Sequence, residues 1–438
     1  MKTIQAIVEL ASAAPVGEVL AMATVMKVRG SSYRRPGARM LVNAAGKSAG
    51  MISGGCLEND VRERAADVVK TGQPVLVTYD STAPEDIIFG LGLGCNGIVQ
   101  VLIEPLAVGD ETGVLAFLAA CVARRQMGRI ATIFHSENVP LSARVLRWPD
   151  GRITSTCTDS AVTAALVHSL RENAARRNAV RNITLPDATS AGVLIETVAP
   201  PLPLTIFGAG DDAMPLAQMA KLLGWHVTVI DARPAYATAE RFPCADAVIC
   251  ERPEALATGS HAVFPPEAMV MIMTHNFGHD RKLLRELLPR ELRYIGILGP
   301  KSRTTRALDD LAEEGIPFRV ENLTRLHGPA GLDIGAETPE EIAVSIIGEM
   351  QAVLSQRRGG ALRDRNAPIH DPADQTTAIR MVDKTALTLG DATQTWDSRP
   401  GCRSGTARPG CPHDGDRGSR DGLPDHDGRD ARPTAPIA

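Results

Sequence analysis

The sequence has few aromatic residues and no excess of basic charge. Phe, Trp and Tyr make up 3% of the 438 residues, and the formal net charge is −4 at pH 7. Proteins that bind nucleic acid need a basic surface, and those that bind single strands also use aromatic rings on which bases stack. We therefore expect no nucleic-acid partner.

Long apolar runs and paired cysteines are missing as well. No stretch reaches the ~20 apolar residues of a membrane span, and residues 1–3 lead into an amphipathic segment instead of a signal-peptide core. The eight cysteines form no Cys-x-x-Cys pair, which argues against a zinc ribbon or a disulfide scaffold. We expect no membrane contact and a soluble, cytoplasmic protein with reduced thiols. Four cysteines lack a recognisable motif and should be buried like small apolar residues: Cys121, Cys157, Cys244 and Cys250.

A chain of this length can form two or more domains, each with its own core. We predict an α/β class protein with an N-terminal α/β domain over residues 1–110 and a middle α/β region with a linker over residues 111–200. A Rossmann-like doubly wound parallel sheet follows over residues 201–362. Residues 363–438 are rich in Gly, Pro, Asp and Arg without an apolar period, which predicts a disordered tail.

The Rossmann prediction rests on a glycine motif between an apolar strand and a helix. The sequence Gly-Ala-Gly-Asp-Asp-Ala at 208–213 has the G-x-G-x-x-A form of a dinucleotide fingerprint. Gly208 and Gly210 would approach a pyrophosphate, and Asp231, at the end of the next strand, would hold a ribose hydroxyl. Asp231 favours NAD as the nucleotide, but Arg233, two residues later, would also allow NADP. The alternative function is therefore an NAD(P)-dependent oxidoreductase.

Two cysteines lie in glycine-rich loops. Gly54 and Gly55 precede Cys56 just before a helix predicted over 57–69, and a helix N-terminus favours a thiolate. Gly94 and Cys95 lie in a second such loop before a predicted strand. Glycine lets the backbone approach a ligand closely, so both loops are candidate cofactor-binding segments. The structural alternative for each cysteine is a small buried side chain.

Further polar loops precede or follow predicted strands. Residues 29–37 hold three arginines, two serines and a tyrosine, which suit either an anion site or a solvated hairpin. His275 and Asn276 follow a predicted strand of the second domain, at the edge where open α/β sheets bind ligands. His275 would contact a ligand or hydrogen-bond the strand end. With His279 it would give a metal pair, but no third ligand is evident.

These segments together resemble the XdhC/CoxI family, the accessory proteins of molybdenum hydroxylases such as xanthine dehydrogenase and carbon monoxide dehydrogenase. The resemblance extends over about residues 5–362. It is carried by six collinear motifs, at residues 30–37, 53–58, 92–97, 273–276, 294–299 and 331–343.

The resemblance implies a cofactor-insertion chaperone, so no catalytic residue is assigned. Family members bind molybdenum cofactor (molybdopterin), protect it while a cysteine desulfurase helps install its sulfido ligand, and deliver it to an apo molybdenum hydroxylase. Cys56 and Cys95 match the two loop cysteines of the family and are expected to contact the cofactor or its molybdenum. Soft thiolates suit a metal already bound by sulfur. The resemblance is also compatible with a homodimer.

Overall fold

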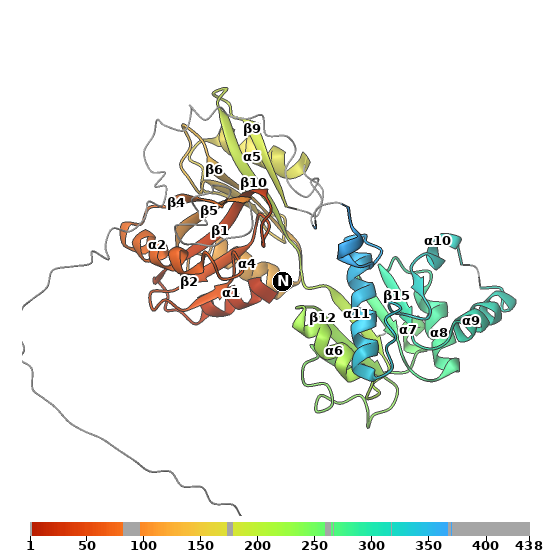
Figure 1. The fold of residues 1–438 in the computed structure, drawn as a ribbon. Coiled ribbons are helices and arrows are strands. Elements are labelled where there is room, and N and C mark those ends of the chain that lie inside the picture. The colour runs from red at the N-terminus through yellow and green to blue at the C-terminus, as the bar shows by residue number, and fades with distance from the viewer. Residues whose placement is uncertain are drawn as a thin grey trace, which may run out of the picture. The chain divides into compact units, whose positions relative to one another are not determined.

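The fold is described from a computed structural model. It describes residues 2–81, 97–172, 178–258, 264, 265, 267–316, 318–366 and 369. Within these residues the strands form three sheets, two antiparallel and one parallel (Figure 1). Among the same residues, no helix combines the length and apolar character that crossing a membrane requires.

The first sheet is antiparallel, with the strand order β3-β2-β1-β5-β4. Helix α2 (Glu58–Thr71) packs its buried Val61, Ala65 and Val68 on one face. On the other face, α1 (Lys2–Ser12) contributes Ile7 to a separate core. The strands are β1 (Val19–Gly30), β2 (Arg39–Val42), β3 (Ser48–Gly50), β4 (Val75–Asp80) and β5 (Gly97–Ala107).

The second sheet is also antiparallel, with the order β8-β7-β6-β10-β9. Its helices are α4 (Val114–Arg124) and α5 (Ser160–Glu172). The apolar runs at residues 130–134 and 144–148 predict β6 and β7, whereas β8 and β9 have polar residues at half or more of their positions and were not predicted. The strands are β6 (Gly128–His135), β7 (Arg144–Arg147), β8 (Ile153–Ser155), β9 (Ala179–Thr184) and β10 (Ser190–Val198).

Two buried ion pairs join the antiparallel sheets. Arg39 Nη2 lies 2.7 Å from Glu196 Oε2, and Arg144 pairs with Glu104. Each pair takes its arginine from one sheet and its glutamate from the other, so neither charge is left alone in the core. A buried charge without such a partner would carry a desolvation cost of several kcal/mol.

The third sheet is the predicted Rossmann-like one, parallel throughout with the order β13-β12-β11-β14-β15-β16. Its apolar strands alternate with helices that cover both faces. The strands are β11 (Pro203–Phe207), β12 (His226–Asp231), β13 (Ala247–Cys250), β14 (Met269–Ile272), β15 (Tyr294–Ile297) and β16 (Leu326–His327). The helices are α6 (Ala213–Leu222), α7 (Ala255–Thr258), α8 (Phe277–Leu287), α9 (Lys301–Glu313), α10 (Val320–Leu323) and α11 (Pro339–Ser355).

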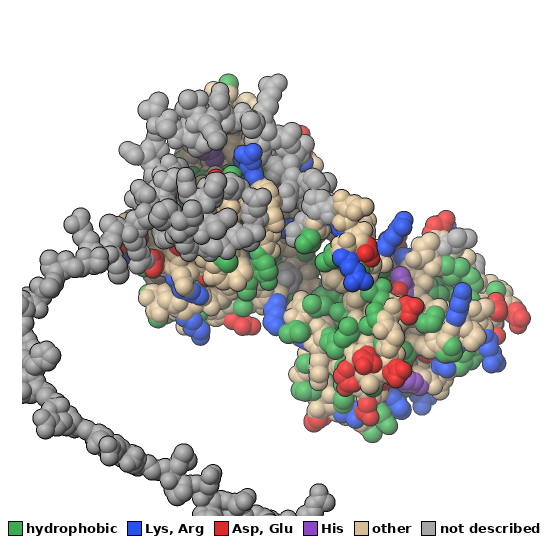
Figure 2. All heavy atoms as spheres, viewed as in Figure 1, with side chains coloured by type: hydrophobic (Ala, Val, Ile, Leu, Met, Phe, Trp, Pro, Cys, Tyr) green, Lys and Arg blue, Asp and Glu red, His purple; other side chains and the backbone are tan. Residues whose placement is uncertain are grey.

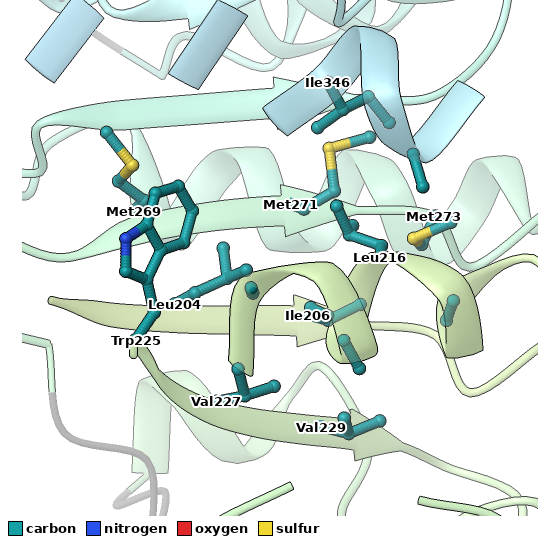
Figure 3. Close-up of a cluster of buried hydrophobic side chains, with 14 of the residues drawn as sticks. Leu204, Ile206, Leu216, Trp225, Val227, Val229, Met269, Met271, Met273 and Ile346 are labelled. Atoms are coloured by element: carbon teal, nitrogen blue, oxygen red, sulfur yellow. The ribbon is translucent and has the colours of Figure 1, made fainter. Parts of the chain in front are cut away.

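The core on one face of this sheet is shown in Figure 3. Ile206, Val229 and Met271 project from three neighbouring strands toward Leu216 of α6 and Ile346 of α11. All five side chains are inaccessible to solvent. Burying a side chain of this size contributes about 1.5–3 kcal/mol, so this apolar layer fixes the strand ends that carry the fingerprint loop.

Two details of the Rossmann region differ from the sequence prediction. The sequence predicts a loop over residues 326–335, but residues 326 and 327 form the edge strand β16. The sequence predicts a helix over residues 279–288, but α8 begins at Phe277, because the Asn276 side chain accepts a hydrogen bond from His279 N and caps the helix there. Past residue 362, the predicted tail lies outside the described residues except for residues 363–366 and 369.

Candidate functional site

A recess forms in the first sheet where three segments of the chain meet. These are the loop after β1, the turn before α2, and the ends of β4 and β5 that lie side by side. Its volume is about 40 Å³, the space of a few water molecules. Its lining residues are Ser31, Ser32, Tyr33, Ile52, Ser53, Gly54, Cys56, Leu57, Tyr79, Ser81, Gly97 and Val99.

The turn that carries Cys56 is fixed by the buried carboxylate of Glu58. Its Oε1 accepts hydrogen bonds from Ser53 N at 2.8 Å and Ile52 N at 3.3 Å, and its Oε2 accepts from Ser53 Oγ. Ser53 Oγ in turn accepts from Gly55 N at 3.2 Å and Leu57 N at 3.1 Å. Five bonds therefore hold the turn in one shape.

The charge state of Glu58 follows from these contacts. Burial raises the pKa of the Glu58 carboxyl, but the hydrogen bonds from Ser53 and Ile52 outweigh it and leave the pKa below its ordinary value. The carboxylate therefore stays ionised and keeps accepting the backbone N–H groups. Our sequence reasoning did not name Glu58 as a site residue, although a glutamate at the first position of a helix after a serine-containing turn is a recognisable signal.

The turn presents the Cys56 thiol to solvent. Cys56 is exposed, and it lies directly before Leu57, the N-cap residue of α2. A buried Cys56, the structural alternative, is therefore wrong. Gly55 has φ +115°, a conformation that favours glycine, and a Cβ placed there would meet open space. A Cβ on Gly54 would lie 3.6 Å from the ring of Tyr33, whose side chain is 64% exposed.

The other wall of the recess is held by close backbone contacts. A Cβ on Gly97 would lie 2.1 Å from Ser31 O, so only glycine lets the loop after β1 lie against β5. Ser81 Oγ donates to Gly97 O at 2.8 Å and accepts from Gly97 N at 3.0 Å. Tyr79 donates to Asp60 Oδ2 at 2.6 Å, and burial followed by the Asp60 contact raises the pKa of its hydroxyl. Cys95 and Gly94 lie outside the described residues.

The remaining cysteines differ in exposure. Cys121 is buried as predicted, while Cys157 and Cys244 are half-buried. The prediction of a buried Cys250 is wrong, because this residue is exposed at the end of the edge strand β13. Cys250 is therefore a useful matched control for Cys56.

The fingerprint loop of the Rossmann region is closely packed. Gly208 has φ +111°, and a Cβ there would lie 2.2 Å from Met273 O. A Cβ on Gly210 would lie 2.5 Å from Asp212 Oδ1. Gly208 therefore serves a close backbone contact within the protein, whereas the contact at Gly210 is with the end of a side chain that can move.

Asp231, the residue predicted to hold a ribose, is already occupied by protein donors. Its Oδ1 accepts from Arg233 N at 2.8 Å and Arg233 Nε at 2.9 Å, and its Oδ2 accepts from Arg233 Nη2 at 2.8 Å and Ala209 N at 2.7 Å. Burial raises the pKa of the Asp231 carboxyl, but the bonds from Arg233 and Ala209 outweigh it and lower the pKa. A ribose hydroxyl would have to displace Arg233.

Other polar side chains at this edge are paired with one another. Asp211 Oδ1 accepts from Arg241 Nη2 at 2.6 Å, and Asp212 Oδ2 lies 2.7 Å from His275 Nε2. His275 has φ +54° and is exposed, while Asn276 caps α8. No group of three potential metal ligands occurs among the described residues.

Several carboxylates lie at this edge. Figure 2 shows acidic side chains gathered at the end of the Rossmann region where α11 begins, and the first turn of α11 carries Glu340 and Glu341. A dinucleotide pyrophosphate at the fingerprint loop would lie close to Asp211 and Asp212. Asp211 already pairs with Arg241 and Asp212 with His275, so a pyrophosphate would have to compete with these carboxylates for the two side chains.

A larger cavity, of about 370 Å³, lies in the second sheet at the loops beside Ser142, Cys157 and Asp187. It contains none of the predicted site residues. We therefore take the smaller recess at Cys56 as the candidate functional site, because it brings together segments that the sequence singled out separately.

Comparison with known proteins places the chain in a family. It is 33% identical over 337 residues to a probable xanthine dehydrogenase subunit of Bacillus subtilis (strain 168), and the match covers 76% of this chain and 92% of that protein. The chain belongs to the XdhC and CoxI family. The XdhC and CoxI family model matches residues 14–80, and the XdhC Rossmann domain model matches residues 204–350.

Two further relatives of this XdhC/CoxI protein are informative. "Molybdenum cofactor insertion chaperone PaoD" of Escherichia coli (strain K12) is 21% identical over 341 residues, or 77% of this chain and 84% of PaoD. A crystal structure described as a xanthine dehydrogenase from Bacillus halodurans has a TM-score of 0.67 and 30% identity. It covers 83% of this chain and 98% of its own. The α/β fold with a Rossmann-like half is thereby confirmed.

Proposed function

We propose that this XdhC/CoxI protein is a molybdenum cofactor chaperone that binds the cofactor, assists its sulfuration and delivers it to a molybdenum hydroxylase such as xanthine dehydrogenase. The observation that carries the proposal is the exposed Cys56 thiol on a rigid turn beside the recess. The names of two relatives support it, one a molybdenum cofactor insertion chaperone and the other part of a probable xanthine dehydrogenase.

The side chains at the recess fit such a cargo. The Cys56 thiol is a soft donor of the kind that suits a metal already bound by sulfur. The exposed ring of Tyr33 offers an apolar face on which a flat pterin can stack. The Ser32 hydroxyl donates to Arg34 O at 3.0 Å, so its oxygen can accept a hydrogen bond from the polar edge of the pterin. A recess of about 40 Å³ admits only a terminal group of the cargo.

The proposed partners are an apo molybdenum hydroxylase and a cysteine desulfurase. A sulfur donor must reach its acceptor directly, and the exposure of Cys56 allows that approach. Cys95 remains a candidate for the second contact. A cytoplasmic location, a homodimer and domain boundaries after residues 110, 200 and 362 are further parts of the proposal.

The proposal is tested by a cofactor-insertion assay. Apo xanthine dehydrogenase receives molybdenum cofactor with and without the full chain, and hydroxylase activity is measured. We expect the chain to raise the yield of active hydroxylase, Cys56→Ser to lose most of that gain, and Cys250→Ser to keep it. Equal yields with and without the chain would contradict the chaperone function.

The alternative, an NAD(P)-dependent oxidoreductase, depends on the fingerprint loop. The four hydrogen bonds that Asp231 accepts from Arg233 and Ala209 weigh against it, as do the carboxylates of Asp211 and Asp212. We expect no saturable binding of NAD or NADP by calorimetric titration. Tight binding of either nucleotide would favour the oxidoreductase.

A further inference from the structure

We infer that the second antiparallel sheet carries a binding site for a small oxyanion, formed by Arg129, Arg147 and Thr197. The proposed chaperone function uses none of these residues, so the inference is independent of it. All three lie outside both glycine loops, and their sequence surroundings carry no recognisable motif.

The three residues form one row across neighbouring strands. Thr197 of β10 is the direct partner of Arg129 on β6, and Arg129 is the direct partner of Arg147 on β7. Direct partners in an antiparallel sheet share a face, with Cβ atoms about 5 Å apart. The next row on that face, Ile195, Ala131 and Val145, packs in the core beneath α5.

Arg129 is buried without the partners that its charge requires. Its residue exposure is 8%, and its Nε and Nη2 have no hydrogen-bond partner. One bond is made, from Arg129 Nη1 to Leu170 O near the end of α5. The hydroxyl of Thr197 is likewise buried without a partner. Buried polar groups in native proteins are almost always satisfied, so orphaned donors point to a bound ion or water.

Charge favours an ion over water. Among the described residues, no carboxylate forms an ion pair with Arg129 or Arg147. Burial and then the neighbouring Arg147 lower the pKa of Arg129, as expected for like charges without a counter-ion. Water would satisfy the N–H groups but leave two positive charges side by side. A carbonyl group such as that of Leu170 does not neutralise a guanidinium.

The donor set selects an oxyanion. A guanidinium presents parallel N–H groups that match two oxygens of a phosphate or sulfate, and the Thr197 hydroxyl can donate to a third. Arg147 is exposed, so the row opens to solvent at its outer end. The ligand class is therefore inorganic phosphate or sulfate, or the phosphate group of a larger molecule that enters past Arg147.

The test is calorimetric titration of the full chain with inorganic phosphate at an ionic strength fixed with chloride. We expect one saturable site per chain. Arg129→Met should weaken binding by about tenfold or more, and Thr197→Val and Arg147→Gln by about three- to tenfold. Arg152→Gln is the control, since Arg152 is an exposed arginine beside β8 that packs on Trp148. A parallel titration with glycerol phosphate distinguishes a free ion from the phosphate of a larger ligand.

Two outcomes would overturn the inference: no saturable phosphate heat, or an affinity that Thr197→Val and Arg147→Gln leave unchanged. The melting temperature distinguishes anion binding by Arg129 from a purely structural role of this residue. If this residue only caps α5, Arg129→Met lowers the melting temperature equally in chloride and in phosphate. If it binds an anion, Arg129→Met also loses the stabilisation that phosphate gives the wild type, so the difference in melting temperature between the two proteins is larger in phosphate than in chloride. If Arg129→Met does not fold, the phosphate affinities of Thr197→Val and Arg147→Gln still test the inference.

Discussion

The turn at residues 53–58 and the fingerprint loop at residues 208–213 are built alike, yet they leave different groups available. Each has a glycine with strongly positive φ and a buried carboxylate that accepts backbone N–H groups, Glu58 in one and Asp231 in the other. At the first, a thiol and an aromatic ring remain exposed. At the second, the three aspartates are paired with Arg233, Arg241 and His275.

The comparison shows that glycine and acidic residues specify the shape of a loop, whereas side-chain pairing decides whether it can receive a ligand. Gly55 borders open space, while Gly208 is pressed against Met273 O. The same sequence signal therefore marks an exposed turn at residues 53–58 and a loop packed against its own protein at residues 208–213. We expect substitutions to separate the two.

Alanine at the two glycines should give the largest difference. Gly208→Ala combines strain at positive φ with a backbone collision, so it should destabilise the Rossmann region by about 4 kcal/mol or more. Gly55→Ala brings strain alone and should cost about 1–2 kcal/mol. Hydrogen exchange read by mass spectrometry measures each region separately. Equal costs would show that the two loops are packed alike.

The two buried carboxylates should differ in their acid dependence. The pKa of Glu58 in the folded state lies below its ordinary value of 4.5, so its stabilisation is present above pH 4.5 and is lost as pH falls toward the folded value. For Asp231 the same loss begins below its ordinary value of 3.8. Glu58→Gln should therefore cost about 1–2 kcal/mol at pH 7 and flatten the acid limb of the first sheet below pH 4.5.

The control for this acid dependence is Asp231→Asn, which should flatten the acid limb of the Rossmann region only. Hydrogen exchange at pH 7 and near pH 3, below the ordinary pKa values of both carboxyl groups, reports both variants. If acid lowers the stability of the first sheet equally in the wild type and in Glu58→Gln, Glu58 does not hold the turn by its charge.

The smallest stability change should come from Tyr33→Ala. Its side chain is 64% exposed, so the free energy of unfolding should change by less than about 0.5 kcal/mol. If Tyr33 stacks on the pterin, affinity for molybdenum cofactor should fall by about tenfold. Tyr236→Ala, an exposed tyrosine of the Rossmann region, should leave that affinity unchanged. A Tyr33→Ala protein with wild-type affinity would remove stacking from the proposal.

Much of the fold could be predicted because its signals are local. The Rossmann strands are apolar runs that alternate with helices, and the runs at residues 204–207, 227–230 and 270–274 predict β11, β12 and β14 within two residues of their ends. The strands β8 and β9 were not predicted, because they are held by pairing to β7 and β10 and have no apolar pattern of their own. The exposure of Cys250 escaped for a related reason, because the sequence does not reveal which strand lies at an edge.

The candidate site could be predicted only in part. Cys56 with its glycines and the serine-containing loop at residues 29–37 were each identified from the sequence, and the structure adds that they line the same recess. The pairing of Asp231 with Arg233 was out of reach, because the same sequence spacing would equally allow the arginine to face solvent. The orphaned donors of Arg129 depend on strand register and burial, which exist only in the folded chain.

The central claim is that the turn carrying Cys56 binds the molybdenum cofactor. It is tested most directly by anaerobic titration of the full chain, Cys56→Ser and Cys250→Ser with molybdenum cofactor. Both cysteines are exposed, so the two variants differ in location and not in accessibility. We predict saturable binding that Cys56→Ser weakens by about tenfold, as expected for loss of a soft metal donor, and that Cys250→Ser leaves unchanged. Wild-type affinity in Cys56→Ser would contradict the account.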